Sequence, residues 1–375
     1  MSKKIIVGFD AKRVVSNGTG LGNYGRTLVN DLSAFPCLDL HLYAPDEGHN
    51  KLRSQVKTAD NLQFHFPHNA IFGTLWRTRG IVDDLKRDGI QVYHGLSGEV
   101  PMGLKKAGIK GVVTIHDLIF MRHPEFYNWI DTKIYIWKFH LALREADHII
   151  AISERTKQDI IELGGVAPSR ITVIYQGFSP RFASSPVISR YRPPTPRYIL
   201  SVGTVEQRKN ILLAVKALHY LPPELSLVVV GRYTAYTDKV VDYVRHHNLE
   251  NRISILHGVS DGDLPALYAG AEAFVYPSIY EGFGIPIVEA ISSGLPVVAC
   301  TGSCLEEAGG PDSLYVDPHD PQAFAAALLQ VLTGAKGREQ RIARSREYIK
   351  KFEGRNVAAQ VLEIYSEVTS VQHPY

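Results

Sequence analysis

Two glutamates on either side of a glycine-flanked turn could bind a polar ligand. Glu281 and Glu289 lie eight positions apart around a Gly-Phe-Gly-Ile-Pro sequence, near the end of an apolar run. Residues 272–278 read as a strand, and Pro286 fits the first turn of a helix that Gly294 ends. We therefore predict that the Glu281 carboxylate projects just ahead of a helix, where a ligand can reach it.

The residues after Glu281 add backbone groups to this candidate site. Gly282 and Gly284 allow the chain to approach a ligand closely. The N–H groups of Phe283, Gly284 and Ile285 are expected to face whatever is bound.

Glu289 is predicted about one turn into the helix, where it could reach a second part of the same ligand, such as ribose hydroxyls. The alternative is that Glu281 is an acid favoured by the helix dipole and Glu289 a solvated surface residue. The combination of two acids with a glycine turn favours a binding site.

A pair of adjacent cations, Arg208 and Lys209, follows the strand-like residues 197–204 and precedes a helical pattern. Such a pair beside the positive end of a helix repels itself unless an anion lies there. The arrangement suits a diphosphate, and the alternative is a solvated loop.

Two histidines lie at the ends of strand-like segments in the first half. His116 is followed by Asp117 after an apolar run, and His94 ends a similar run. A histidine at the carboxyl end of a parallel strand can hydrogen-bond a ligand. We predict this role for His116, with a structural histidine bonded to a loop carbonyl as the alternative. For His94, which has no acidic neighbour, the structural role is favoured.

The stretch GLGNYG, residues 20–25, matches the dinucleotide-binding pattern G-x-G-x-x-G. In that pattern the first glycine directly follows a strand, but here the sequence AKRVVSN intervenes after Asp10. The match is therefore out of register. We predict instead a glycine loop that leads into a helix beginning near Tyr24. The amides of Gly20 and Gly22 could bind an anion or a sugar hydroxyl, and a plain surface loop is the alternative.

Short β-rich runs that alternate with helical patterns must position these residues. The predicted strands of the first half are residues 4–11, 38–44, 62–67, 90–96, 111–117, 147–153 and 171–177. Those of the second half are residues 197–204, 225–231, 252–258, 272–278, 295–300 and 313–317. This alternation is typical of parallel sheets covered by helices on both faces. We predict an α/β protein with two doubly wound, Rossmann-like domains whose strand ends face a central cleft.

The proline- and serine-rich residues 179–197 resist both helix and central strand, so we place an interdomain linker there. The predicted N-terminal domain covers residues 1–180 and the predicted C-terminal domain residues 195–353. A terminal helix is predicted at about residues 354–375, and the sequence leaves open which domain it packs against.

Composition narrows the classes of function. The net charge of +3 is too small to indicate nucleic-acid binding. Three cysteines, Cys37, Cys300 and Cys304, are too few and too poorly spaced for a disulfide framework or zinc site, and we expect buried thiols. No apolar run is long enough to span a bilayer, and the N-terminal residues lack a signal-peptide core. We therefore expect a cytoplasmic protein, with association at the inner membrane face left open.

The sequence EGFGIPIVE, followed by SGLPVVA, resembles the retaining glycosyltransferases of family 4, which have the GT-B fold. Other similar stretches follow in the family's order over nearly the whole chain: TIHDL, AISERTKQDI, VGTVEQRKN, HGVSDGDLPALYAGA and GSCLEEAGG. The resemblance is more specific in the second half.

The resemblance implies roles for the candidate residues. Glu281 and His116 would contact the donor sugar at the reaction centre, and Glu289 would bind the ribose. Arg208 and Lys209 would neutralise the donor diphosphate. The remaining implied donor contacts are Val259, which brackets the base, the backbone of Phe283, Gly284 and Ile285, and the amides of Gly20 or Gly22.

One residue departs from the family pattern. Thr204 stands where many members carry an arginine, so neutralisation would depend more heavily on the later cation pair. The aromatic-rich residues 120–139 lie where family members bind acceptors, although helical core packing explains most of them.

The resemblance implies transfer of a sugar from a nucleotide-diphosphate sugar, of GDP-mannose or UDP-sugar type, to a glycan or lipid-linked acceptor. Cell-surface polysaccharide synthesis is the setting it suggests. We expect a retaining reaction without metal or cofactor. The alternatives are an NAD-dependent dehydrogenase built on the N-terminal glycines, and a non-catalytic module that binds nucleotide sugars.

Overall fold

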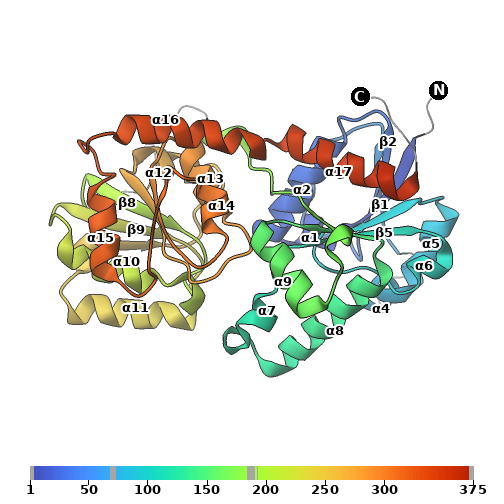
Figure 1. Cartoon of the computed structure of the whole chain (residues 1–375), viewed down its shortest axis with the longest axis horizontal. Helices are drawn as coiled ribbons and strands as arrows, with labels where there is room; N and C mark the ends of the chain where they lie inside the picture. Colours follow the sequence, from blue (N-terminus) through green and yellow to red (C-terminus); the bar gives the residue numbers. More distant parts are fainter. Residues whose placement is uncertain (1–3, 68–72, 184–190, 192, 371–375) are drawn as a thin grey trace. The chain divides into compact units, whose positions relative to one another are not determined.

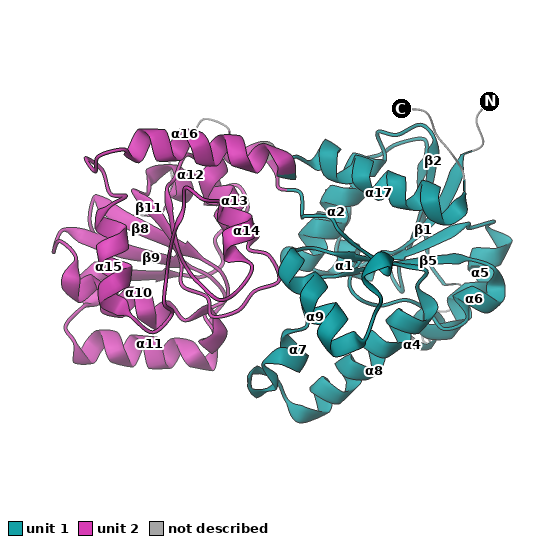
Figure 2. Ribbon diagram, viewed as in Figure 1, with its two compact units in different colours: residues 1–177, 352–375 teal, residues 178–351 magenta. Residues whose placement is uncertain are grey.

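The computed structural model describes residues 4–67, 73–183, 191 and 193–370. The chain divides into two compact units (Figures 1 and 2). The first contains Met1–Gly177 and Phe352–Tyr375, and the second contains Phe178–Lys351. Part of the predicted linker, residues 184–190 and 192, lies outside the described residues.

The first unit is built on a parallel sheet in the order β3-β2-β1-β4-β5-β6-β7. Its strands are β1 (Ile5–Asp10), β2 (Leu38–Tyr43), β3 (Leu62–His65), β4 (Val92–Gly95), β5 (Lys110–Ile115), β6 (His148–Ala151) and β7 (Ile171–Val173). Its helices are α1 (Lys12–Ser16), α2 (Gly20–Leu32), α3 (Asn50–Arg53), α4 (Gly73–Leu75), α5 (Ile81–Arg87), α6 (Leu104–Ala107), α7 (Ile119–Arg122), α8 (Trp129–Glu145), α9 (Glu154–Gly164) and α17 (Gly354–Thr369).

The second unit has a parallel sheet in the order β10-β9-β8-β11-β12-β13. Its strands are β8 (Arg197–Val202), β9 (Leu225–Val230), β10 (Ile253–Leu256), β11 (Ala273–Tyr276), β12 (Val297–Cys300) and β13 (Leu314–Val316). Its helices are α10 (Ile211–Ala217), α11 (Ala235–His246), α12 (Leu264–Gly270), α13 (Ile285–Ser292), α14 (Leu305–Gly309), α15 (Pro321–Leu329) and α16 (Arg338–Tyr348).

Each predicted strand is present, and the two doubly wound sheets confirm the predicted fold class. The central strands are rich in apolar residues because helices cover both faces of a parallel sheet. In β9, for example, all the residues of Leu225–Val230 are buried. The cysteines fit this core in part: Cys300 and Cys304 are buried, but Cys37 is only half-buried, contrary to prediction.

The helix α17 belongs to the first unit, which answers the question that the sequence left open. It packs against α2, β1 and β4. Val357, Val361 and Tyr365 of α17 join the apolar core of β1 and β2. The Tyr365 hydroxyl also hydrogen-bonds His94 Nδ1 at 2.6 Å.

In each sheet the strand order reverses once. The reversal falls between β1 and β4 in the first sheet and between β8 and β11 in the second. In open α/β sheets, ligands bind beyond the carboxyl ends of the strands at such a switch point. In the second unit, the segments that follow β8 and β11 contain Arg208, Lys209 and Glu281.

Candidate active site

Two cations and a carboxylate meet beyond the ends of β8 and β11. Arg208 and Lys209 lie in a 3₁₀ turn, Gln207–Lys209, and Glu281 lies in the loop after β11. One carboxylate oxygen of Glu281 is 2.6 Å from Lys209 Nζ and 2.8 Å from Arg208 Nη1. The cation pair suggested a neighbouring anion, and in this structure that anion is Glu281.

Burial and charge act in opposite directions on these groups. Burial alone would raise the pKa of Glu281, but Lys209 and Arg208 outweigh it and lower that pKa to about 2. Burial likewise disfavours the charged form of Lys209, yet Glu281 raises the pKa of this ammonium above its usual value. All three groups are therefore charged at neutral pH, and loss of one partner leaves a buried charge uncompensated.

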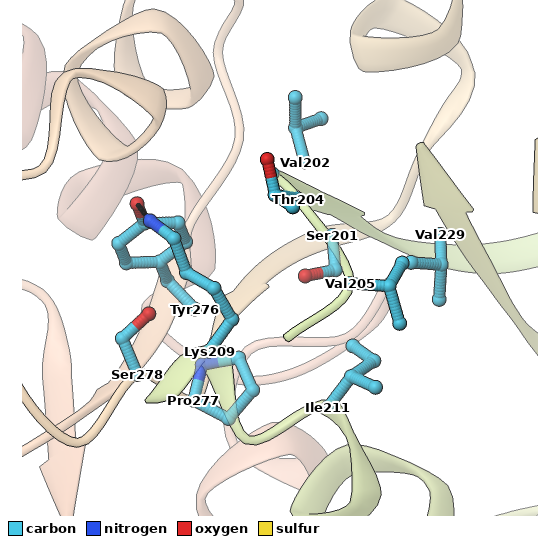
Figure 3. Close-up of a pocket in the computed structure, with 11 residues that line it drawn as sticks. Ser201, Val202, Thr204, Val205, Lys209, Ile211, Val229, Tyr276, Pro277 and Ser278 are labelled. Carbon is cyan, nitrogen blue, oxygen red and sulfur yellow. Dashed lines mark hydrogen bonds between the residues drawn. The ribbon is translucent and has the colours of Figure 1, made fainter. Parts of the chain in front are cut away.

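Lys209 also contacts an aromatic residue of β11. Its Nζ donates a hydrogen bond of 2.6 Å to the Tyr276 hydroxyl and lies 4.8 Å from the ring centroid. Burial raises the pKa of Tyr276 to about 12, so the hydroxyl stays neutral. Figure 3 shows the Lys209 side chain beside Tyr276 in a pocket that Thr204 also lines. Thr204, the residue that departs from the pattern of the resembled family, is thus part of the wall of this pocket.

The turn that carries Arg208 is fastened to the loop that carries Glu281. The Arg208 guanidinium donates a hydrogen bond of 2.6 Å to Tyr280 O, and the Ile279 N–H donates one of 2.9 Å to Arg208 O. Arg208 also pairs with Glu206 at 2.8 Å. Neither cation lies in a solvated loop, because the side chains of Arg208 and Lys209 are only 15% and 17% exposed.

The loop after Glu281 contains one position that requires glycine, whereas close approach of a ligand there stays a prediction. Gly284 has φ 113° and directly precedes α13, which begins at Ile285. A Cβ atom at Gly284 would lie 3.2 Å from Leu305 Cδ2, so both backbone conformation and space favour glycine there. Phe283 is buried, and Val259 lies half-buried in the loop after β10.

Glu289 lies on α13 and is separate from the cation pair. The Tyr268 hydroxyl donates a hydrogen bond of 3.1 Å to its carboxylate. Burial raises the pKa of Glu289 to about 7, although the nearby Arg181 opposes this shift. Glu289 is thus partly protonated near neutral pH. Its contact with Tyr268 could not be predicted from the sequence.

His116 is held inside the first unit. Its Nε2–H donates a hydrogen bond of 2.8 Å to Leu96 O, and its Nδ1 accepts one of 2.8 Å from Gln176 Nε2. Burial lowers the pKa of His116 to about 4, so the ring is neutral at pH 7. These bonds match the alternative of a structural histidine, and its contact with a donor sugar stays a prediction. His116 also lines a cavity of about 230 Å³.

His94 has the structural role that the sequence favoured. It is fully buried, and its second ring nitrogen, Nε2, lies 2.8 Å from Thr114 Oγ1. Burial lowers its pKa to about 3.

The predicted glycine loop is shorter than expected, because α2 begins at Gly20 and not near Tyr24. Asn17 Oδ1 accepts hydrogen bonds from the Thr19 N–H and hydroxyl, which turns the chain into the helix early. Gly20 and Gly22 therefore lie in the first helical turn. A Cβ atom at Gly22 would lie 1.8 Å from Asn17 O, so this glycine is required by packing.

One group of metal-ligating residues lies elsewhere among the described residues. His41, His65 and Asp88 place one ligand atom each within 4.8 Å of one another. However, the two imidazole rings are stacked with an interplanar angle of 8°. An ion lies in the plane of an imidazole that binds it, so these rings do not converge on one ion as they stand.

Two doubly wound sheets, with a cation pair beyond the strands at a switch point, define an α/β protein suited to an anionic ligand. Family models identify it further: residues 18–182 match "Glycosyltransferase Family 4", and residues 189–348 match "Glycosyl transferases group 1". The chain belongs to this glycosyltransferase family.

Two relatives agree with this assignment, and a solved structure shares the fold. The O-antigen chain mannosyltransferase B of Escherichia coli is 34% identical over 73% of this chain and 74% of its own length. The O-antigen chain mannosyltransferase RfbU of Salmonella typhimurium is 28% identical over 58% of this chain and 60% of its own. The fold is similar to that of sucrose-phosphate synthase from Thermosynechococcus elongatus, with a TM-score of 0.78 and 19% identity. The match covers 98% of this chain and 100% of that structure.

The NAD-dependent dehydrogenase alternative is not favoured by these matches. Within the described residues, no helix combines the length and apolar character needed to cross a membrane.

Proposed function

We propose that the protein transfers a mannosyl group from a nucleotide-diphosphate sugar to a glycan or lipid-linked saccharide acceptor during cell-surface polysaccharide synthesis. GDP-mannose is the donor that we would test first, with UDP-sugars as the competing class. The two O-antigen chain mannosyltransferases similar to this chain support the choice of sugar. The observation that carries the proposal is the Arg208–Lys209–Glu281 cluster beyond β8 and β11.

In this proposal the diphosphate of the donor binds Arg208 and Lys209. Transfer breaks the anomeric C–O bond, which leaves negative charge on the departing diphosphate and positive charge on the sugar. Preorganised cations stabilise such a leaving group most strongly where water is excluded. Since both side chains are already largely buried, they supply this charge without a metal ion.

Glu281 has two roles in the proposed cycle. Before the donor binds, its carboxylate pairs with both cations, and Glu206 supplies a second negative charge to Arg208. When the diphosphate takes over Arg208 and Lys209, the carboxylate becomes available to the donor sugar. The acceptor hydroxyl then attacks on the face that the diphosphate leaves, and its proton passes to a diphosphate oxygen. This step retains the anomeric configuration and needs no side-chain nucleophile.

The other predicted donor contacts keep their places in the proposal. Glu289 is assigned to the ribose hydroxyls and Val259 to the base, with the backbone of Phe283, Gly284 and Ile285 near the sugar and phosphate. His116, Gly20 and Gly22 belong to the first unit. For His116 to bind the sugar through Nδ1, it must exchange its bond to Gln176.

The cavity beside His116 supports assignment of the acceptor to the first unit. Its lining combines aromatic rings with charged side chains, including Phe120, Tyr127, Tyr135, Glu99 and Lys138. A mixed lining of this kind suits a saccharide, which presents both apolar faces and hydroxyl groups.

Exposed apolar residues on α8 support peripheral association with a membrane surface in the same proposal. Trp129 is 73% exposed, and Ile130, Ile134 and Trp137 are also exposed. Tryptophan favours the membrane–water interface. Sedimentation with lipid vesicles tests this point: loss of binding in a Trp129→Ser and Trp137→Ser double variant supports it, and unchanged sedimentation contradicts it.

The central experiment is a thermal-shift panel with GDP, UDP, ADP and NAD, followed by transfer assays with the matching nucleotide sugars in the presence of EDTA. A ligand that binds the folded state raises its stability by about 2.7 kcal/mol at a hundredfold excess over Kd. A selective shift with one nucleoside diphosphate, together with transfer that survives EDTA, would support the proposal. Proton NMR of the product reports the anomeric configuration. Stabilisation by NAD alone would contradict the proposed glycosyl transfer.

A further inference from the structure

The backbone of Glu281 has a second set of contacts, which is independent of its ion pairs. Its N–H donates a hydrogen bond of 2.8 Å to Ser303 Oγ. In turn, the Ser303 hydroxyl donates a hydrogen bond of 3.3 Å to Glu281 O. The neighbouring Cys304 thiol is 3.1 Å from Glu281 O and 3.2 Å from Phe283 O. Two adjacent side chains thus bind both polar backbone groups of Glu281.

Ser303 and Cys304 come from a different loop than the cations. They follow β12 and immediately precede α14, whereas Arg208 and Lys209 follow β8. Strand β11 lies between β8 and β12 in the sheet, so the loop after β11 is held from both sides. One side binds the Glu281 side chain and the other side binds its backbone.

Cys304 is suited to this contact as a neutral thiol. The residue is fully buried, and burial raises the pKa of its thiol well above the usual value. It therefore keeps the proton that it donates. A thiolate at the same position would repel the carbonyl oxygens of Glu281 and Phe283.

We infer that Ser303 and Cys304 are positioning residues, which hold Glu281 in place once the donor diphosphate has taken its cation partners. This inference rests on the proposed function. In the structure the carboxylate is held by two ion pairs, so the backbone contacts are partly redundant. With the diphosphate bound, Arg208 and Lys209 turn to the phosphates, and the backbone contacts then decide where the carboxylate stands.

Because the cations bind the diphosphate while Ser303 and Cys304 position Glu281, variants of these residues are expected to differ in their kinetics. Ser303 touches neither cation in the described structure, so its loss is expected to leave the affinity for the nucleoside diphosphate unchanged. The same loss is expected to lower kcat about 10- to 100-fold, because a displacement of about 1 Å at a reacting group costs about that much. A residue that only stabilised the fold would not separate these two quantities.

The test compares variants of the full chain in the transfer assay and in calorimetric titration with the nucleoside diphosphate that the wild type binds. Ser303→Ala is expected to lose kcat, with Kd within about twofold of wild type. Ser303→Thr keeps the hydroxyl and is expected to recover most of the rate. Thr301→Ala is the matched control, since Thr301 is exposed on the same loop and its hydroxyl points to Val316 O.

Cys304 gives a second, independent pair of variants. Cys304→Ser keeps a donor and is expected to remain active, whereas Cys304→Ala is expected to lose kcat as Ser303→Ala does. This pair decides the question if Ser303→Ala fails to fold. Unchanged kcat in both alanine variants overturns the inference, and so does an equal loss of kcat and diphosphate affinity. Absence of transfer by the wild type would instead overturn the proposed function, and the positioning role with it.

Discussion

Lys209 and Glu281, which are 72 positions apart in the sequence, form a buried ion pair with their charged atoms 2.6 Å apart. Together with the pair between Arg208 and Glu206, it balances the charges of the two buried cations. Under the proposed function, a donor diphosphate therefore competes with the Glu281 carboxylate for Arg208 and Lys209. This competition leads to predictions for nucleotide affinity and for the rate of transfer.

Replacement of Lys209 by alanine is expected to weaken binding of the nucleoside diphosphate. The lost charge-assisted hydrogen bond is worth about 1.5–3 kcal/mol, which corresponds to roughly 10- to 100-fold in Kd. Isothermal titration measures the change. Lys239→Ala, at an exposed position on α11, is the matched control. Equal affinity in Lys209→Ala and wild type would remove this residue from the diphosphate site.

Replacement of Glu281 by glutamine is expected to separate binding from transfer. The diphosphate no longer competes with a carboxylate, so its affinity is expected to stay the same or increase. Transfer is expected to fall about 10²- to 10³-fold, as for loss of a preorganised electrostatic contact. Glu250→Gln, at an exposed position, serves as the control. Loss of nucleotide affinity in Glu281→Gln would show that the carboxylate is needed for binding itself.

Glu289 is expected to make stability fall as the pH rises. Burial raises its pKa to about 7 in the folded state, above the value of about 4.3 in an unfolded chain. Between these values the folded state binds more protons, so the free energy of unfolding decreases with increasing pH. Glu289→Gln is therefore expected to gain stability relative to wild type at pH 8 and to match it near pH 4. Urea unfolding across this range checks the sign, and parallel curves would contradict it.

His116 is expected to act in the opposite direction. Its pKa is lowered by burial to about 4, from about 6.5 in an unfolded chain. Here the unfolded state binds more protons, so the stability from the neutral ring is complete above about pH 6.5 and is lost towards pH 4. His116→Gln should flatten this part of the stability curve. A wild-type curve no steeper than that of the variant would show that His116 is not buried in its neutral form.

The strands could be predicted because buried segments consist mostly of apolar residues. Helices cover both faces of each sheet, so central strands such as β9 are apolar runs, and a polar residue at the end of such a run stands out. The turn around Gly284 was readable for a related reason, since its positive φ and close packing both call for glycine. These are local requirements that a short window of sequence records.

Partners from distant segments could not be predicted. The sequence showed two adjacent cations but not that Glu281 would be their anion, because the pairing depends on β8 and β11 being neighbours. Ser303 was visible only as part of a family-like stretch, and Cys304 was predicted to be buried but not to contact the backbone of Glu281. The ring nitrogens of His116 looked available until the structure placed Leu96 O and Gln176 beside them. The predicted start of α2 near Tyr24 was wrong. The Asn17 side chain, and not the glycine content, turns the chain into the helix at Gly20.

The placement of α17 affects how the chain can fold during synthesis. This helix completes the core around β1 and β2, yet the ribosome makes it only after the whole of the second unit, residues 178–351. The second unit is contiguous and can fold while translation continues. The first unit must wait with part of its apolar surface uncovered, and closing it joins segments separated by a long loop, which is slow. A ribosome stalled before α17 would therefore carry a finished second unit beside an unfinished first one, which is the form most exposed to chaperones and proteases.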